Sequence, residues 1–474
     1  MSELITTNRV LIVSDLHFGG SDRQIFAGAI ELPALLRDAA KASAQSGRTA
    51  FVINGDFIDF LAEAPATYFD ALGAVEKLRR VARDATFADS FVAMGEFANT
   101  PGCVLAINLG NHDLELCLPE VQAAFCELIG SNNVLWVSDG SGVSLRVGAC
   151  EVLCLHGNEV DINNVVDFDV LRDIKRAHKT GKPKERLNPK WIPNAGTQLV
   201  IDAMNAIKRD HAFIDVLKPE DQAAVRVLLA LDFEGATQLV KPALNAMFGR
   251  RTIDQMKRHF GLLSESDEVG GVIPQYGDAK DWLSEIDADF KRGVRADSES
   301  LDRDQLKWTD DVRFVWDKWR GKDGTESLRL ALEGLSKDRS FDVFTAEKLN
   351  EDLIGEVDIG IAFLCSGHTH FARSLRRGPN AHHYNSGTWA YLMQIGDDIR
   401  LDPAKFDALV AALRSKPSLA ELETLGYLKK ELTVIDIEKI DAQQTRGQLR
   451  RVKIENNTYR FDTIPGTDVV LRGA

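Results

Sequence analysis

The chain has few of the residues that stabilise secreted proteins or build membrane spans. Its 474 residues include only six cysteines, and no two of them form a Cys-x-x-Cys pair. No apolar run approaches the eighteen or so residues needed to cross a bilayer, and the first residues lack the features of a secretory signal. These absences argue against a disulfide-rich scaffold and a membrane protein. We therefore expect no membrane span, buried reduced thiols and a cytoplasmic location.

Positively charged residues are also fewer than negatively charged ones. Lysine and arginine number 57 against 71 aspartate and glutamate residues, which gives a formal net charge of -14. This balance argues against extended nucleic acid or an anionic membrane as the main partner. A hydrophobic content of 44% and a charged content of 27% are typical of a soluble globular protein, and the length favours two or three domains.

Short apolar runs of strand length alternate with helical patterns in the first third of the chain. The predicted strands cover residues 10–13, 50–53, 103–108, 134–137, 142–147 and 151–155. A long helical region spans roughly residues 66–99. This alternation predicts an α/β core, in which functional residues gather at the strand ends where the connecting loops emerge.

The pattern changes between Glu159 and about Val357, where the sequence becomes charged and helix-forming. Predicted helical segments there cover residues 165–179, 196–217, 220–231 and 306–319. A strand pattern resumes at 359–365, and further strands are expected at 383–389 and 432–437, with a helical stretch at 403–425. We predict a core formed by residues 1–158 and 358–474, the latter with a C-terminal extension, interrupted by a helical insertion at 159–357.

Five short motifs, nearly all directly behind a strand-like run, contain the chemically informative residues. They are Asp15-Leu16-His17, Gly55-Asp56, Gly110-Asn111-His112-Asp113, His156-Gly157-Asn158 and Gly367-His368-Thr369-His370. An Asp-x-His alone is weak, because one is expected by chance in a chain of this length, and Gly55-Asp56 alone is weaker still. Gly367-His368-Thr369-His370 after a strand is much rarer, and all five motifs in order make coincidence implausible. Together they supply three carboxylates, five imidazoles and the two amides of Asn111 and Asn158. That set suits two divalent metals sharing a carboxylate, with Mn favoured and Fe, Zn or Co compatible.

In this order the motifs resemble those of calcineurin-like metallophosphoesterases, over roughly residues 8–160 and 355–395. The resemblance implies a two-sheet β-sandwich flanked by helices. The insertion begins just after His156 and ends just before His368, so its ends are expected near the metals and it is predicted to form a cap. The resemblance also implies that Asp56 bridges two metals and that His112 stands over them without binding either. The ligands implied for one metal are Asp15, His17 and His370, and those for the other are Asn111, His156 and His368.

Some segments are similar to the bacterial UDP-2,3-diacylglucosamine hydrolases and their relatives. They are residues 15–19, 55–59, 367–370 and 385–389. Two features depart from that group: Asn158 stands where an acid is common, and the insertion is far larger than the usual lid. The similarity therefore bears on the chemistry more than on the substrate.

The predicted reaction is hydrolysis of a phosphodiester or pyrophosphate, in a phosphorylated small molecule or a nucleotide-like substrate. Two ions about 3.5–4 Å apart hold a water and lower its pKa, and the bridging hydroxide attacks phosphorus in line. His112 is the candidate general acid, oriented by Asp113, and Asp59 is either a partner of a ligand histidine or an exposed loop acid. The alternatives are a nuclease or cyclic-nucleotide phosphodiesterase and, in another class, an inactive protein-binding scaffold.

The first part of the insertion is locally basic, although the whole protein is acidic. Arg172, Lys175, Arg176 and Lys179 are candidate substrate-binding residues, and Lys182, Lys184, Arg186 and Lys190 extend the stretch. These side chains either bind a second phosphate or form an ordinary solvated helix face. Outside the motifs, His178, His211 and His259 are interpreted as structural, whereas His382 and His383 either line the edge of the site or belong to the core. The aromatic group Trp308, Phe314, Trp316 and Trp319 favours core packing.

Overall fold

The computed structural model describes residues 4–181, 211–218 and 339–473, apart from Asn163 and Asn457, and five isolated positions between 219 and 338. The chain divides into two compact units. The first comprises residues 1–198, 339–392 and 429–474, and the second comprises 199–338 and 393–428. All five motifs belong to the first unit. The predicted domain boundaries stay a prediction, because most of the segment between residues 159 and 357 lies outside the described residues.

Several expectations fall on that segment. The predicted helices at 220–231 and 306–319, the four aromatic residues of the latter region, His259 and most of the helix at 196–217 lie outside the description. The same holds for the basic residues beyond position 181. Within the described residues, no helix is both long enough and apolar enough to span a membrane.

The larger sheet of the first unit contains eight strands, in the order β16-β15-β14-β2-β3-β4-β5 with β17 paired to β15. Its centre is parallel, because β2 pairs with β3, β3 with β4 and β4 with β5 in the same direction. The parallel strands are β2 (Arg9–Val13), β3 (Thr49–Asn54), β4 (Cys103–Asn108) and β5 (Val134–Val137). The antiparallel strands are β14 (Thr433–Lys439), β15 (Gln444–Glu455), β16 (Thr458–Thr463) and β17 (Val469–Arg472).

The second sheet contains six strands in the order β1-β6-β7-β9-β11-β10. Its strands are β1 (Ile5–Thr7), β6 (Val143–Val147), β7 (Cys150–Cys154), β9 (Phe363–Ser366), β10 (Ala372–Gly378) and β11 (Ala381–Ser386). β9 runs parallel to both β7 and β11. The sheet therefore joins the segment before the insertion to the segment after it.

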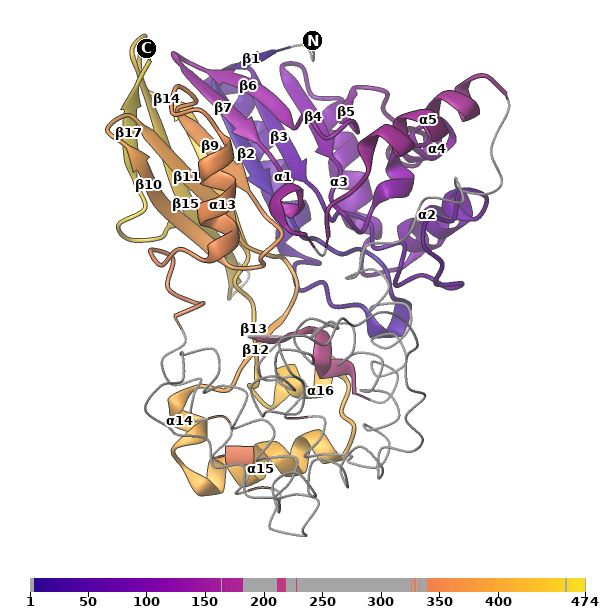
Figure 1. Ribbon diagram of the computed structural model, residues 1–474, viewed down its shortest axis with the longest axis vertical. Coiled ribbons are helices and arrows are strands. Elements are labelled where there is room, and N and C mark those ends of the chain that lie inside the picture. Colours follow the sequence, from indigo (N-terminus) through magenta and orange to yellow (C-terminus); the bar gives the residue numbers. More distant parts are fainter. Residues whose placement is uncertain are drawn as a thin grey trace, which may run out of the picture. The chain divides into compact units, whose positions relative to one another are not determined.

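Apolar side chains point alternately to the two faces of the central strands, which explains why the two sheets stack. Leu11 and Val13 belong to the apolar cluster shared with the helices, whereas Val10 and Ile12 belong to a second cluster shared with the other sheet. Successive side chains of a strand point to opposite faces, so both faces of the central sheet are buried. The result is a two-sheet β-sandwich flanked by helices (Figure 1), and the predicted fold class is confirmed.

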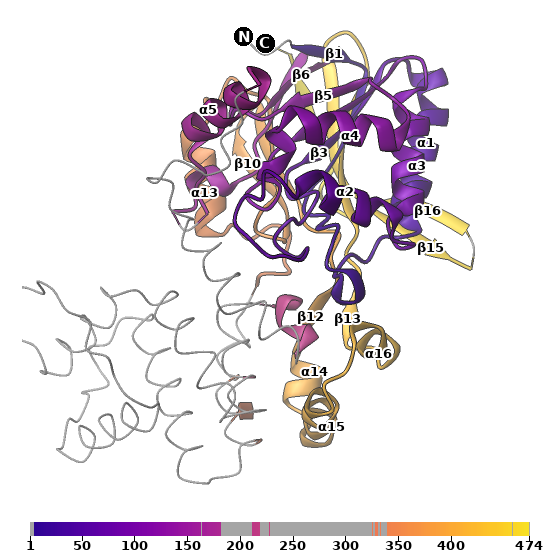
Figure 2. The same cartoon turned by 90° about the vertical axis from the view of Figure 1, so that its right-hand side faces the viewer.

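Four helices pack on the outer face of the larger sheet. They are α1 (Glu31–Ser46), α2 (Ala74–Arg83), α3 (Ala88–Ala98) and α4 (Pro119–Ile129). Figure 2 shows α1 beside α3, a pair that is in direct contact. The predicted single helical region at 66–99 is instead two helices, α2 and α3. Asp84 adopts an extended backbone after α2 and its side chain accepts a hydrogen bond from Thr86 N at 2.8 Å, which competes with helix continuation.

The described ends of the predicted insertion meet in space. The short 3-10 helix η3 (Asn158–Val160) lies at its start, and α13 (Lys348–Glu356) near its end packs against η3. α5 (Phe168–Lys179) follows η3 and contacts α4 and the 3-10 helix η2 (Leu114–Cys117). All six cysteines are free thiols, and five of them are buried.

In the second unit, the described elements are short. They are η5 (Ala212–Asp215), β8 (Leu217–Lys218), β12 (Leu392–Gln394), α14 (Asp397–Arg400), α15 (Pro403–Arg414) and α16 (Leu419–Thr424), with β13 (Leu428–Lys429) paired to β12. Asp402 caps α15 and Ser418 caps α16, so the helical stretch expected at 403–425 is two helices. His211, expected within a helix, instead precedes η5.

Close packing of α3 against the end of α4 gives a stability prediction. A Cβ at Gly95 would lie 2.0 Å from the backbone oxygen of Ile129, which cannot rotate away. We expect Gly95→Ala to lower the free energy of unfolding by about 1–3 kcal/mol, measured by urea denaturation. Gly355→Ala is the matched control, because that helical glycine has open space around it and alanine stabilises a helix by up to about 1 kcal/mol. Equal effects of the two substitutions would contradict the packing described.

Candidate metal centre

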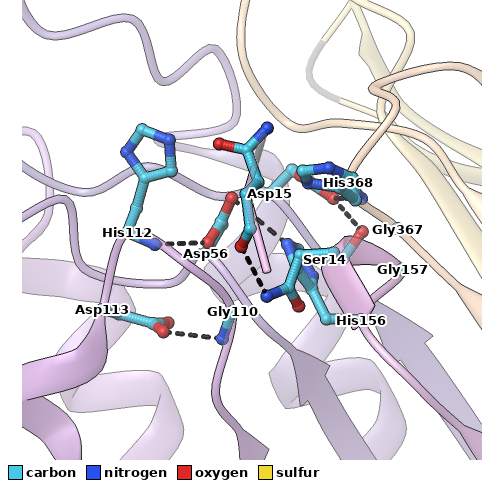
Figure 3. A network of polar contacts seen from close by, with 12 residues as sticks. Ser14, Asp15, Asp56, Gly110, His112, Asp113, His156, Gly157, Gly367 and His368 are labelled. Carbon is cyan, nitrogen blue, oxygen red and sulfur yellow. Dashed lines mark hydrogen bonds and ion pairs between the residues drawn. The ribbon is translucent and has the colours of Figure 1, made fainter. Parts of the chain in front are cut away.

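The five motifs converge because each follows a strand of the sandwich. Asp15, Asp56 and Asn111 come after the parallel strands β2, β3 and β4. His156 and His368 come after β7 and β9, which are parallel neighbours in the other sheet. The carboxyl ends of parallel strands share one edge of a sheet, so both sheets deliver their motifs to one place. Figure 3 shows the side chains from these loops facing one another.

The backbone at this place is unusual. Five motif residues have a left-handed φ, between 47° and 69°: Asp15, His17, Asp56, His368 and His370. They are five of the nine non-glycine residues with positive φ in the described chain. Such conformations cost of order 1–3 kcal/mol each and cluster at functional sites. The surrounding structure therefore holds these five side chains in directions that an unstrained backbone would not give them.

Two glycines allow the loops to approach closely. A Cβ at Gly110 would lie 2.1 Å from Asp56 Oδ1, and one at Gly367 would lie 2.2 Å from Ser14 Oγ. Both motif glycines are therefore required by contact between loops rather than by a turn.

One group of possible ligands contains Asp15, His17 and His370. The Nε2 atoms of the two histidines are 3.1 Å apart, and His370 Nε2 is 3.4 Å from Asp15 Oδ1. Two ring nitrogens and a carboxylate oxygen thus point to one small space. That convergence is what three ligands of a single cation require.

A second group contains Asp56, His156 and His368. His156 Nε2 lies 3.2 Å from Asp56 Oδ2, and its Nδ1 lies 2.8 Å from the backbone oxygen of Asn54. That backbone contact fixes Nδ1 as the protonated nitrogen and leaves Nε2 for a metal. The Asp56 carboxylate also lies 4.0 Å from His17 Nε2, so it stands between the two groups, where a bridging ligand belongs.

The electrostatics of the second group favour positive charge. Burial lowers the pKa of His156, but the charge and hydrogen bond of Asp56 outweigh it and raise that pKa to about 10. Burial likewise acts to raise the pKa of Asp56, yet His156 and His112 hold it well below its ordinary value. A place that stabilises a proton so strongly also suits a metal cation.

Asn111 supplies an independent test of whether a metal fits. Its side chain is buried, and its Oδ1 has no hydrogen-bond partner among the residues that the structure describes. A buried acceptor left unsatisfied costs about 1–3 kcal/mol, so such atoms need an explanation. A cation beside Oδ1 provides one, and the donor set of imidazole, carboxylate and amide oxygen suits Mn, Fe, Zn or Co.

The structure differs from the prediction on what orients His112. The Asp113 carboxylate accepts a hydrogen bond from the backbone N–H group of Gly110 at 2.7 Å (Figure 3). It also accepts one from the backbone N–H group of Phe57 at 2.8 Å, so it ties two motif loops together. Burial, with the nearby Asp56 charge, raises the pKa of Asp113 to about 7. Asp113 therefore acts on the loops and not on the His112 ring.

Asp59 is the acid beside that ring. Its Oδ1 lies 3.5 Å from His112 Nδ1 and its Oδ2 lies 3.6 Å from His17 Nδ1. Burial works to raise the pKa of Asp59, but His112 and His17 keep it well below its usual value. Of the two interpretations of Asp59 from the sequence, contact with a site histidine agrees with the structure, since Asp59 is buried.

Several supporting contacts escaped the sequence analysis because they involve ordinary polar residues. Ser14 Oγ donates to the Asp15 carboxylate and contacts Ser386 Oγ at 2.6 Å. The backbone oxygen of Asp15 accepts from Thr388 Oγ1 at 2.9 Å and from Trp389 N at 3.1 Å. The segment 385–389 was singled out by its similarity, but nothing in the sequence indicated that it holds Asp15.

The predicted substrate-binding residues all lie on α5. Arg172 and Arg176 pair with Asp169 and Asp173 of the same helix, and Lys175 donates to Ser138 Oγ at 2.6 Å. These partners are not members of the metal groups, so a role of Arg172, Lys175, Arg176 and Lys179 in binding stays a prediction. His178 contacts Glu120, which agrees with a structural role.

His382 and His383 are buried in β11. His383 Nε2 lies 2.9 Å from Ser366 Oγ, and His382 Nε2 lies 3.0 Å from Ser374 Oγ. Burial lowers the pKa of His383 to about 3, so it stays neutral. Both histidines are buried in the sheet and contact serine hydroxyls through Nε2, which favours the core interpretation of the sequence over the edge of the site.

Comparison with known proteins agrees with this geometry. Residues 8–215 match the calcineurin-like phosphoesterase family. The match supports the resemblance to that superfamily, and it includes every motif except Gly367-His368-Thr369-His370. A crystal structure of a dimetal phosphatase from Danio rerio covers 99% of both chains at 10% identity, with a TM-score of 0.31 that is too low to support a shared fold. No curated protein matches the chain.

The two bonds of Asp113 give a stability prediction for the region that matches this family. An asparagine at position 113 offers one acceptor oxygen, so one of two buried N–H groups would lose its partner. We expect Asp113→Asn to lower the free energy of unfolding by about 1–3 kcal/mol. Asp38→Asn, at an exposed position of α1, is the control and should stay within about 0.5 kcal/mol of the parent in the same urea titration. Equal free energies of unfolding for the two variants would show that Asp113 does not tie the loops together.

Proposed function

We propose that the protein is a two-metal hydrolase of phosphate esters. The observation that carries this proposal is the convergence of two histidine–carboxylate groups on the shared carboxylate of Asp56, beside the unpaired amide oxygen of Asn111. Asp15, His17 and His370 would hold one metal, and Asn111, His156 and His368 the other. The match of residues 8–215 to calcineurin-like phosphoesterases supports the same chemistry.

The residues of the chain have distinct tasks in such a reaction. Bound divalent metals supply Lewis acidity, which activates water and neutralises charge on phosphoryl oxygens. His112 lies outside both proposed ligand sets, with its ring 5.0 Å from that of His17 in an edge-to-face contact. We assign His112 as the general acid that protonates the leaving oxygen, held by Asp59 at Nδ1. Asp113 is assigned a positioning role.

The proposed substrate is a phosphodiester or pyrophosphate in a small molecule or nucleotide-like compound, and Mn is the favoured metal. The motif similarity to UDP-2,3-diacylglucosamine hydrolases supports the phosphoester chemistry more than the identity of the substrate. The net charge of -14 argues against long nucleic acid as the substrate. Six free thiols agree with a reducing, cytoplasmic location.

Metal stoichiometry tests the bridging assignment. Protein stripped with chelator and titrated with Mn²⁺ should bind two equivalents, and at one hundred times the dissociation constant each site should add about 2.7 kcal/mol to stability. At the Mn²⁺ concentration that saturates the parent, Asp15→Asn should keep one equivalent, whereas Asp56→Asn should keep neither. Loss of a single equivalent in both variants would contradict a shared carboxylate.

Leaving-group dependence tests His112. With Mn²⁺ present, we expect His112→Ala to reduce kcat about 10²- to 10⁴-fold for diphenyl phosphate, whose leaving phenolate needs a proton. The loss should be much smaller for bis-p-nitrophenyl phosphate, whose leaving group needs no proton. Metal content should equal that of the parent because His112 is not assigned as a ligand. An equal loss for both esters would assign His112 a role other than proton donor.

The same assays separate the alternatives. Faster turnover of p-nitrophenyl phosphate than of bis-p-nitrophenyl phosphate would change the proposed substrate class from a phosphodiester to a phosphomonoester. Hydrolysis of oligonucleotides or cyclic nucleotides in preference to small diesters would favour a nuclease or cyclic-nucleotide phosphodiesterase. Inactivity with Mn, Fe, Zn and Co alike would identify an inactive scaffold.

A further inference from the structure

Asp161, three residues after the His156 motif, contacts His368, the other histidine of the second group. His368 Nε2 lies 2.9 Å from Asp161 Oδ2. Both side chains are mostly buried, with exposed fractions of 8% for His368 and 12% for Asp161. Solvent therefore screens this contact little. An imidazole N–H beside a largely buried carboxylate forms a charge-assisted hydrogen bond.

The remaining contacts of His368 fix its place. Its backbone N–H donates to the Asp15 carboxylate at 3.0 Å, and its ring meets that of His156 edge-to-face at 5.3 Å between centroids. Because Nε2 is engaged by Asp161, Nδ1 is the nitrogen left as a ligand in the group that His368 forms with Asp56 and His156. The carboxylate thus selects the tautomer with the proton on Nε2.

Asp161 is itself held by its loop. Its backbone N–H donates to the oxygen of Asn158 at 3.2 Å, and its Oδ2 accepts from Asn164 Nδ2 at 2.7 Å. Glu159, in the same loop, accepts from the backbone N–H groups of His156, at 3.1 Å, and Gly157, at 2.6 Å. One short loop therefore supports both histidines of the second group, one through its backbone and the other through its ring.

We infer that Asp161 is a positioning residue for the second metal, acting by orienting His368. The inference rests on the proposed two-metal function, because it assumes that His368 binds a cation. Partners of this kind, which hydrogen-bond the outer nitrogen of a ligand histidine, raise its basicity and fix its ring, and their loss costs about 10- to 100-fold in metal affinity.

The test is metal binding by the full-length protein without any turnover. Chelator-treated parent, Asp161→Asn and the charge-matched control Asp169→Asn are titrated with Mn²⁺ by calorimetry. Asp169 is an exposed residue of α5 with an exposed side-chain fraction of 86%. We expect Asp161→Asn to weaken one of two sites about 10- to 100-fold and to leave the other unchanged, while Asp169→Asn matches the parent.

Electron paramagnetic resonance adds a readout that a merely structural role would not change. At sub-saturating Mn²⁺, the exchange-coupled signal of a metal pair should weaken in Asp161→Asn, with an unchanged melting temperature of the metal-free protein. Asp161→Glu should restore part of the affinity. Parent-like binding at both sites in Asp161→Asn, or a matching loss in Asp169→Asn, would overturn the role of Asp161. A parent that binds no Mn²⁺, Fe, Zn or Co would instead overturn the proposed function.

Discussion

Burial of negative charge is the constraint on which the rest of the site depends. Asp15 is fully buried and Asp56 is 2% exposed, and an uncompensated buried carboxylate costs several kcal/mol. Compensation comes from imidazoles and backbone N–H groups: His368 N donates to Asp15, and His112 N donates to Asp56 Oδ1 at 2.9 Å. These bonds leave oxygens of both carboxylates facing ring nitrogens, where the charge of an imidazolium or of a metal cation compensates that of the carboxylate.

That compensation can be built only where several strand ends meet. Each motif loop contributes one or two groups, and no loop could surround a buried carboxylate alone. The parallel centre of the larger sheet brings Asp15, Asp56 and Asn111 together, and the parallel pair β7 and β9 adds His156 and His368. The left-handed backbone at five of the motif residues is the conformational cost of this convergence, offset by the apolar burial of both sheet faces.

The sequence predicted the fold well where local signals and tertiary structure agree. Strand β4 matches residues 103–108 and β5 matches 134–137 to the residue, because continuous apolar runs reflect burial on both faces. The break between α2 and α3 escaped prediction because Asp84 acts through its own side chain, which helical periodicity does not record. The contact of Asp59 with His112 and that of Asp161 with His368 join residues whose pairing depends on how loops fold over each other.

Asn158 shows how the neighbours of a motif residue can supply a group that the motif position itself lacks. In the resemblance to UDP-2,3-diacylglucosamine hydrolases, Asn158 stands where an acid is common, which weakens the resemblance when only that position is considered. In the structure, Asn158 Nδ2 donates to the backbone oxygen of Asn164 at 3.1 Å and so closes the loop. Acidic groups are present nearby: Glu159 holds the backbone of the His156 motif, and Asp161 contacts His368. Negative charge is therefore present in this loop one and three residues after Asn158. The residue at a motif position must therefore be judged together with the groups that surround it in space. Here Glu159 and Asp161 of the same loop supply the acidic groups.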